Sequence, residues 1–345
     1  MGPASLFTRL RALRLSLDGF TLAILGMVVL ASVLPARGGF ASFLDVATDI
    51  GVAILFFMHG AKLSRQDIVA GIGHWRLHIV VLLSTYALFP LVVLGFRVFE
   101  GVLIAPELMI GLLFLAALPS TVQSSIAFTS IAGGNVAAAV GAASLSSLAG
   151  VFLTPLLVSV LIHFEGQMDL SAAVLKIVVQ ILLPFVIGHL ARPLIGTFMM
   201  RQKKLLNAFD RGTIVAIVYA AFSVSVVEGL WETLGVVTIL ATIAISGLLF
   251  VIIFLTTRTA SRALKFSTED EITIVFCGSK KSLAAGMPMA KVLFPGSASL
   301  GAMILPLMIF HQLQLMACAS IARRYARRLV EEDAGTSTAP AAPTA

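Results

Sequence analysis

Long apolar segments, each bounded by charged residues or by glycine and proline, dominate the chain. A segment of about 20 predominantly apolar residues is long enough to cross a bilayer as an α-helix. Ten such segments follow one another with short polar connections between them. They lie at 18–35, 43–61, 77–98, 106–131, 136–162, 171–193, 212–229, 233–257, 270–291 and 299–322. This pattern predicts an all-α membrane protein with ten transmembrane helices.

The positions of the basic residues provide a second test of this count. Lysine and arginine concentrate in the cytoplasmic loops of membrane proteins. If the N-terminus is cytoplasmic, 18 of the 24 lysines and arginines fall in predicted cytoplasmic segments. These 18 residues are Arg9, Arg11, Arg14, Lys62, Arg65, Arg76, Arg192, Arg201, Lys203, Lys204, Arg211, Arg258, Arg262, Lys265, Arg323, Arg324, Arg327 and Arg328. The alternation predicts an even number of crossings, both termini in the cytoplasm and a location in the inner membrane.

The ten helices divide into two halves of five, at 18–162 and 171–322, between a cytoplasmic N-terminus (1–17) and a cytoplasmic, largely disordered tail (323–345). An odd number of helices in each half gives the halves opposite orientations, which is typical of inverted-topology repeats. Solute sites in such proteins form near the midplane, where helices are interrupted. The same helix of each half is therefore expected to be interrupted.

The composition excludes several classes of protein. Apolar residues make up 59% of the chain and charged residues 12%, far from a soluble domain, so the lipid bilayer is the main partner. The net charge of +7 is spread in short clusters without interleaved aromatic residues, which argues against nucleic acid as a partner. Cys277 and Cys318 lie in apolar segments without metal-ligand spacing, so no metal site is predicted.

Two polar stretches interrupt the fourth and ninth apolar segments, at a depth of roughly 13 to 20 Å for a helix rising about 1.5 Å per residue. Proline removes a helical hydrogen bond and leaves backbone carbonyls available to a cation. The two stretches are predicted to bind the solute or ion, together with Ser144 of the fifth segment. Their candidate residues are Pro119, Ser120, Thr121, Gln123, Ser124 and Ser125, and Gly278, Ser279, Lys280, Lys281 and Ser282.

Lys280 and Lys281 are the most informative of these residues. A lysine at the bilayer centre costs about 2.5 to 3.5 kcal/mol on insertion scales, and snorkelling from this depth needs a water-filled vestibule. The acidic residues fall in loops or near the ends of the segments. Hydroxyls, the carbonyls of an interrupted helix or an anionic solute are therefore the expected partners.

The two polar stretches resemble the bile acid:sodium symporter family (solute carrier family 10), over nearly the whole chain. Pro119 to Asn135 is similar to that family's helix 4 stretch and its Gly-Asn turn. Phe276 to Leu283, followed by Gly286 to Met289, resembles the atypical branch related to human member seven. The resemblance implies that helices 4 and 9 cross at the midplane in a core domain, and that helices 1, 2, 6 and 7 form a panel domain.

Typical members of that family bind two sodium ions beside the crossing. The resemblance maps the sodium ligands of helix 4 onto Ser124 and Ser125, and those of helix 9 onto Phe276 and Lys280. An ammonium at a ligand position disfavours sodium electrostatically, so sodium coupling is doubtful. Sodium and the proton both stay open as the coupling ion, with Lys280 and His311 as candidates for proton coupling.

The sequence therefore predicts a secondary transporter that moves a small organic, anionic solute by alternating access. A membrane sensor or regulator of ion homeostasis that transports nothing is the alternative. No HExxH, GxGD or nucleophile-elbow motif occurs, so the chain is not expected to be an enzyme, and no cofactor is expected apart from a coupling ion.

Overall fold

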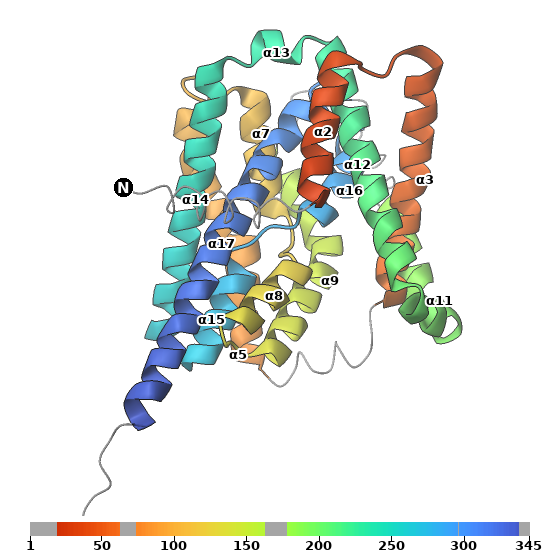
Figure 1. Cartoon of the computed structure of the whole chain (residues 1–345). Helices are drawn as coiled ribbons and strands as arrows, with labels where there is room; N and C mark the ends of the chain where they lie inside the picture. Colours follow the sequence, from red (N-terminus) through yellow and green to blue (C-terminus); the bar gives the residue numbers. More distant parts are fainter. Residues whose placement is uncertain (1–18, 63–73, 163–177, 296, 338–345) are drawn as a thin grey trace, which may run out of the picture.

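A computed structural model describes residues 19–62, 74–162, 178–295 and 297–337 (Figure 1). These residues form helices joined by short connections, and within these ranges there is no strand beyond one isolated bridge between Glu100 and Ile104. Seven helices are long and apolar enough to cross a membrane. The predicted all-α membrane class is therefore confirmed.

Four helices on one side of the molecule form a unit of their own, the panel unit (Figure 1). Its elements are α2 (Gly19–Val33), α3 (Gly38–Lys62), the π-helical turn η3 (Val178–Leu182) with α11 (Leu183–Arg201), and α12 (Lys203–Val227). Helices α3 and α11 cross at Gly60 and Gly188, where a Cβ atom would lie 1.9 Å from a backbone carbonyl of the other helix. Glycine is required there because the two backbones touch.

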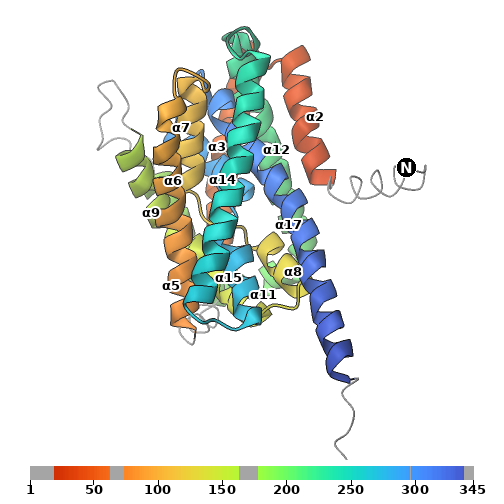
Figure 2. The ribbon, with the colours of Figure 1, turned by 90° about the vertical axis from the view of Figure 1, so that its left-hand side faces the viewer.

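The remaining helices pack together as the core unit, which α13 (Leu230–Thr233) connects to the panel unit (Figure 2). Its elements are α5 (Trp75–Leu83), η1 (Ser84–Leu88), α6 (Phe89–Gly95), η2 (Phe96–Phe99), α7 (Pro106–Ala117), α8 (Gln123–Ile131), α9 (Val136–Leu161), α14 (Val236–Ala263), α15 (Thr268–Gly278), α16 (Leu283–Leu293) and α17 (Leu300–Ser337). Contacts of α12 with α16 and α17 join the two units.

Both predicted interruptions occur. Residues 118–122 separate α7 from α8, and residues 279–282 separate α15 from α16. Pro119 lacks an N–H and biases Leu118 away from the helical region, and Leu118 is indeed extended, with φ −75° and ψ 156°.

Several boundaries differ from the sequence prediction: α3 begins at Gly38 rather than 43, and α11 ends at Arg201 rather than 193. Helix α12 begins at Lys203 rather than near 212, because only Gln202 separates it from α11. Helix α14 continues to Ala263, and α17 continues to Ser337 through residues assigned to the tail. Polar residues prolong these helices beyond the apolar stretch that a bilayer needs, so hydropathy alone misplaces their ends. Residues 1–18 and 338–345 lie outside the described ranges.

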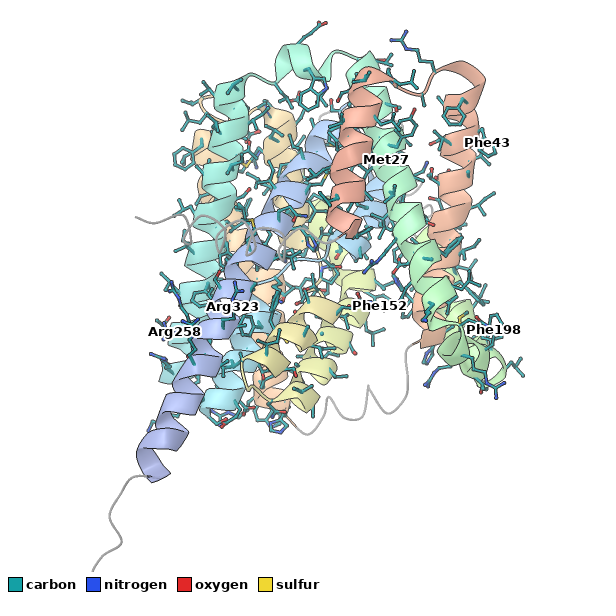
Figure 3. The ribbon with its side chains drawn as sticks, in the orientation of Figure 1. Met27, Phe43, Phe152, Phe198, Arg258 and Arg323 are labelled. Carbon is teal, nitrogen blue, oxygen red and sulfur yellow. The ribbon has the colours of Figure 1, made fainter. Side chains whose placement is uncertain are left out.

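Large apolar side chains are exposed along the sides of the molecule. Phe43, Phe152 and Phe198 lie at different heights on three different helices and are 65%, 53% and 55% exposed (Figure 3). Arg258 and Arg323 lie in the lower half of the molecule in this view, and we call the lower end the basic end (Figure 3). Exposed apolar side chains of this kind are suited to contact with lipid.

Candidate functional site

The two interruptions lie against each other in the interior of the core unit. The Ser282 N–H donates a hydrogen bond of 2.9 Å to the Pro119 carbonyl, which joins one break directly to the other. The side chains of Ser120, Lys280 and Lys281 are buried there. Residues more than 150 positions apart in the sequence thus form one buried polar centre.

Serine hydroxyls satisfy the last carbonyls of α15. A helix end leaves carbonyls without an intrahelical partner, and each one needs a donor when it is buried. The donors come from α8, from the break before it and from η1. The pairs are Ser125 with Phe276 at 2.9 Å, Ser120 with Cys277 at 2.5 Å, and Ser84 with Gly278 at 2.8 Å.

The corresponding carbonyls of α7 have different donors. The Thr154 hydroxyl donates to the Ala117 carbonyl over 2.8 Å. The Lys281 ammonium donates to the carbonyls of Ala116 and Leu118, each over 2.7 Å. One helix end is therefore satisfied mainly by neutral hydroxyls and the other mainly by a cation.

Lys281 donates a third hydrogen bond of 2.7 Å to the Thr85 carbonyl. We call the carbonyl oxygens of Thr85, Ala116 and Leu118 the carbonyl cage. A neutral amine has only two N–H groups, whereas an ammonium has three and carbonyls only accept. The geometry therefore requires a protonated Lys281. The Phe89 ring, with its centre 4.2 Å from Nζ, adds a cation–π contact.

The third oxygen of the cage is free because of a local irregularity in the third membrane segment. The Phe89 N–H donates to the Ser84 carbonyl in a π-helical turn, so it does not reach Thr85. The next residue, Pro90, has no N–H to offer. The Thr85 carbonyl is thus left for Lys281.

Gln314 of α17 fixes the backbone of Lys281 from the opposite side. Its amide oxygen accepts from the Lys281 N–H, and its amide nitrogen donates to the Lys281 carbonyl, both over 2.8 Å. The same amide nitrogen lies 2.9 Å from Nδ1 of His311. His311, the candidate for proton coupling on α17, is therefore linked to Lys281 through Gln314.

Lys280 has far fewer hydrogen-bond acceptors than Lys281. Its Nζ is fully buried and lies 3.5 Å from the Ser124 hydroxyl, a long hydrogen bond. The centre of the Phe128 ring is 4.2 Å away and that of Phe276 is 5.5 Å away. Within the described ranges, no salt bridge involves either of the two central lysines. A buried cation with so few acceptors can accommodate an anion.

The other predicted site residues differ in their involvement. Thr121 bonds to the hydroxyls of Ser124 and Ser125, over 2.8 and 3.1 Å, inside the site. Gln123, by contrast, is exposed. The Ser279 hydroxyl donates to Val275 of its own helix. Ser144 is half-buried on α9, and the hydroxyl on α9 that contacts the break belongs to Ser146, which accepts from the Ser120 N–H over 3.0 Å.

Several residues of the site were missed from the sequence. They are Ser84, Thr85, Tyr86, Ser146, Thr154 and Gln314. Two signals were available. Proline inside a membrane helix, here Pro90, marks a carbonyl without its usual partner, and Gln314 is a polar residue halfway along the tenth apolar segment. Among the described residues, no group of three or more His, Cys, Asp or Glu side chains is placed to hold a metal ion.

Comparison with known proteins agrees with this architecture. A model of the SBF-like CPA transporter family matches residues 18–327. The chain belongs to this family. It is 53% identical over 312 residues to "Putative symporter YfeH" of Escherichia coli, covering 90% of this chain and 94% of the relative. It is also 53% identical to an uncharacterised protein of Pseudomonas aeruginosa, over 94% of this chain and 97% of the relative.

A more distant relative is named Sodium/bile acid cotransporter 7, from Danio rerio. The two are 28% identical over 312 residues, covering 88% of this chain and 92% of the relative. The resemblance deduced from the two polar stretches is therefore confirmed. Membership of a family of transporters also favours transport over the sensor and the enzyme.

Proposed function

We propose that this protein is a secondary transporter of a small organic anion, which binds beside Lys280 at the first turn of α8. Two features that lie together support this proposal. The N-terminus of α8 has no capping side chain, and the buried Lys280 ammonium has only one long hydrogen bond. The first turn of a helix exposes N–H groups and the positive end of the helix dipole, which together attract an anion.

The beginnings of the two inner half-helices differ in this respect. Helix α16 is capped, because the Ser282 hydroxyl accepts from the Ala285 N–H over 3.1 Å. Helix α8 begins at Gln123 with no side-chain cap. Gln123 is exposed and Ser124 is half-buried, so a solute can reach this turn from one side. An anion there would accept from the free N–H groups and from Lys280.

Alternating access requires two units that move against each other, and an ion pair between the units supports this. Lys291 of α16 lies 2.7 Å from a carboxylate oxygen of Asp45 and 3.3 Å from one of Asp49, both on α3. A cavity of about 350 Å³ adjoins the pair between α3, α12 and α16. Asp45 and Asp49 lie in the first half of α3, whose N-terminal end is opposite the basic end (Figure 1), and there the pair would open and close one path to the site.

The membrane topology is part of the proposal. Ten crossings result when the seven long apolar helices are counted with α2 and with the two interrupted pairs, α7 with α8 and α15 with α16. They form two inverted halves of five. Arg258 and Arg323 mark the basic end (Figure 3), which the distribution of lysine and arginine assigns to the cytoplasm of the inner membrane. Both termini then lie in the cytoplasm.

Coupling is proposed to be independent of sodium, with Lys280 or His311 exchanging a proton in its place. Lys280 falls at the position that the family resemblance assigns to a sodium ligand. In proteoliposomes, we expect uptake of the anion to be equal in sodium and in choline at constant ionic strength and to change with external pH. Uptake that requires sodium would contradict this part of the proposal.

The experiment that tests the proposed function is a thermal unfolding screen with cholate, benzoate and sulfate, followed by uptake of the radiolabelled hit. An anion that stabilises the wild type should not stabilise Lys280→Met, whereas Lys291→Met keeps the shift because it leaves the Lys280 environment intact. Binding without any uptake would favour the sensor. A shift that survives in Lys280→Met would place the anion elsewhere and overturn the assignment.

A further inference from the structure

The carbonyl cage has a second property that the transport proposal does not use. We propose that the oxygens of Thr85, Ala116 and Leu118 form a site for a monovalent cation, and that the chain fills this site with its own Lys281 ammonium. Three oxygens converge on one point at 2.7 Å each. This is the arrangement by which backbone carbonyls replace the hydration shell of an ion.

Each oxygen of the cage is one that the backbone cannot satisfy by itself. Ala116 would be paired with the N–H of Ser120 in an unbroken helix, but that N–H donates to Ser146. Leu118 lies in the break itself, and Thr85 is left free by the π-turn and Pro90. The fold therefore leaves three carbonyl oxygens without backbone donors at one buried position, whichever group then donates to them.

The electrostatics favour a cation over a neutral donor. Ala116 and Leu118 lie at the C-terminus of α7, the negative end of its dipole, and the Phe89 ring presents its face to the same ammonium. The end of α15 shows that serine hydroxyls suffice when carbonyls diverge toward different helices. Convergent carbonyls instead need one group with three donors or a bare ion.

Removal of the side chain alone should convert the filled site into a vacant one. Lys281→Ala deletes the ammonium and its stem and leaves a polar cavity with three oxygens. Ammonium, which reproduces the lost group, and potassium should then bind. Lys281→Met is the matched control, since an apolar chain of similar length occupies the cavity and leaves no room for an ion.

The test compares the thermal stability of the purified variants in ammonium, potassium and sodium chloride against choline chloride at constant ionic strength. We expect Lys281→Ala to show a saturable rise in the unfolding temperature with ammonium, smaller rises with potassium and sodium, and no such rise for Lys281→Met. Lys280→Ala, which leaves the cage filled, should behave as the wild type, without an ammonium-specific rise.

Two results would overturn the inference. One is a folded Lys281→Ala protein whose stability is the same in all four chlorides. The other is a rise of equal size in Lys281→Met, which would show that the ions act elsewhere. If Lys281→Ala does not fold, Lys281→Ser is measured in the same way, and failure of both variants to fold in every chloride would mean that the cage accepts no free cation.

One consequence rests on the proposed function: transport by the wild type would need no free cation at the cage, and transport by Lys281→Ala would come to depend on ammonium or potassium. The stability measurement requires no transport. Absence of transport by the wild type, with an intact ammonium effect on the stability of Lys281→Ala, would therefore contradict the proposed function alone.

Discussion

Lys280 and Lys281 are neighbours in the sequence, are equally buried, and have opposite environments. The Lys281 ammonium has three carbonyl acceptors at 2.7 Å, while Lys280 has one hydroxyl at 3.5 Å and two aromatic rings. The number of acceptors, rather than burial, therefore separates a structural cation from a group available to a solute. The difference arises because the two side chains leave the break toward different elements, Lys280 toward α8 and Lys281 toward η1 and the end of α7.

The comparison has a physical consequence for the transport cycle. The hydrogen bonds of Lys281 connect α7, η1 and, through Gln314, α17, so moving it would break contacts among three segments of the core unit. Moving Lys280 would break one long hydrogen bond. The core unit can thus remain rigid around Lys281 while Lys280 responds to what binds.

The largest effect is expected for Lys281→Met. Three buried carbonyls would lose their donor, at about 1 to 3 kcal/mol each, so the loss of unfolding free energy should be at least about 3 kcal/mol. Chemical or thermal unfolding in detergent measures this loss. A loss as small as that of Lys280→Met would contradict the distinction between the two lysines.

Gln314→Leu tests the backbone of the same region. It removes both partners of the Lys281 peptide groups, and two buried groups without partners should cost about 2 kcal/mol in the same unfolding measurement. Ser124→Ala is the matched control. It removes the long contact of Lys280 and the hydrogen bond to the Thr121 hydroxyl, which keeps Ser125 as a partner, so it should cost about 1 kcal/mol or less. Equal costs would mean that the region around Lys281 is not the more tightly held.

Ser84→Ala and Ser279→Ala measure how much the hydroxyl donors at the end of α15 contribute to stability. Ser84→Ala leaves the buried Gly278 carbonyl without its hydroxyl donor and should cost about 1 kcal/mol. The Val275 carbonyl keeps the Ser279 N–H when the Ser279 hydroxyl is removed, so that change should cost less than about 0.5 kcal/mol. The reverse order in a thermal unfolding series would show that the Ser84 hydroxyl does not satisfy Gly278.

Lys280→Met should have the smallest effect on stability, about 1 kcal/mol or less in either direction. The lost cation–π contacts offset the relief from burying a charge with few acceptors. The same variant should lose all anion-dependent stabilisation, which is measured by titrating cholate, benzoate and sulfate during unfolding. A large loss of stability would indicate that Lys280 is structural as well.

The sequence by itself determined the class of the protein and the location of its polar centre. Apolar segments of membrane length determine helices, since every backbone group in lipid must be satisfied within its own segment. Pro119 and the two lysines marked both interruptions, because proline and buried charge are costly at those positions in a membrane helix. The resemblance to a transporter family followed from the same residues.

The roles of the individual residues were decided by the tertiary structure. Composition marks Lys280 and Lys281 as equivalent, and the resemblance singled out Lys280 as the substitute for a cation, whereas the carbonyl cage surrounds Lys281. The acceptors of the cage come from Thr85, Ala116 and Leu118, more than 160 positions before Lys281. A single sequence shows local helix propensity and the cost of burying a charge. Which distant carbonyls lack a donor is decided only when the helices pack.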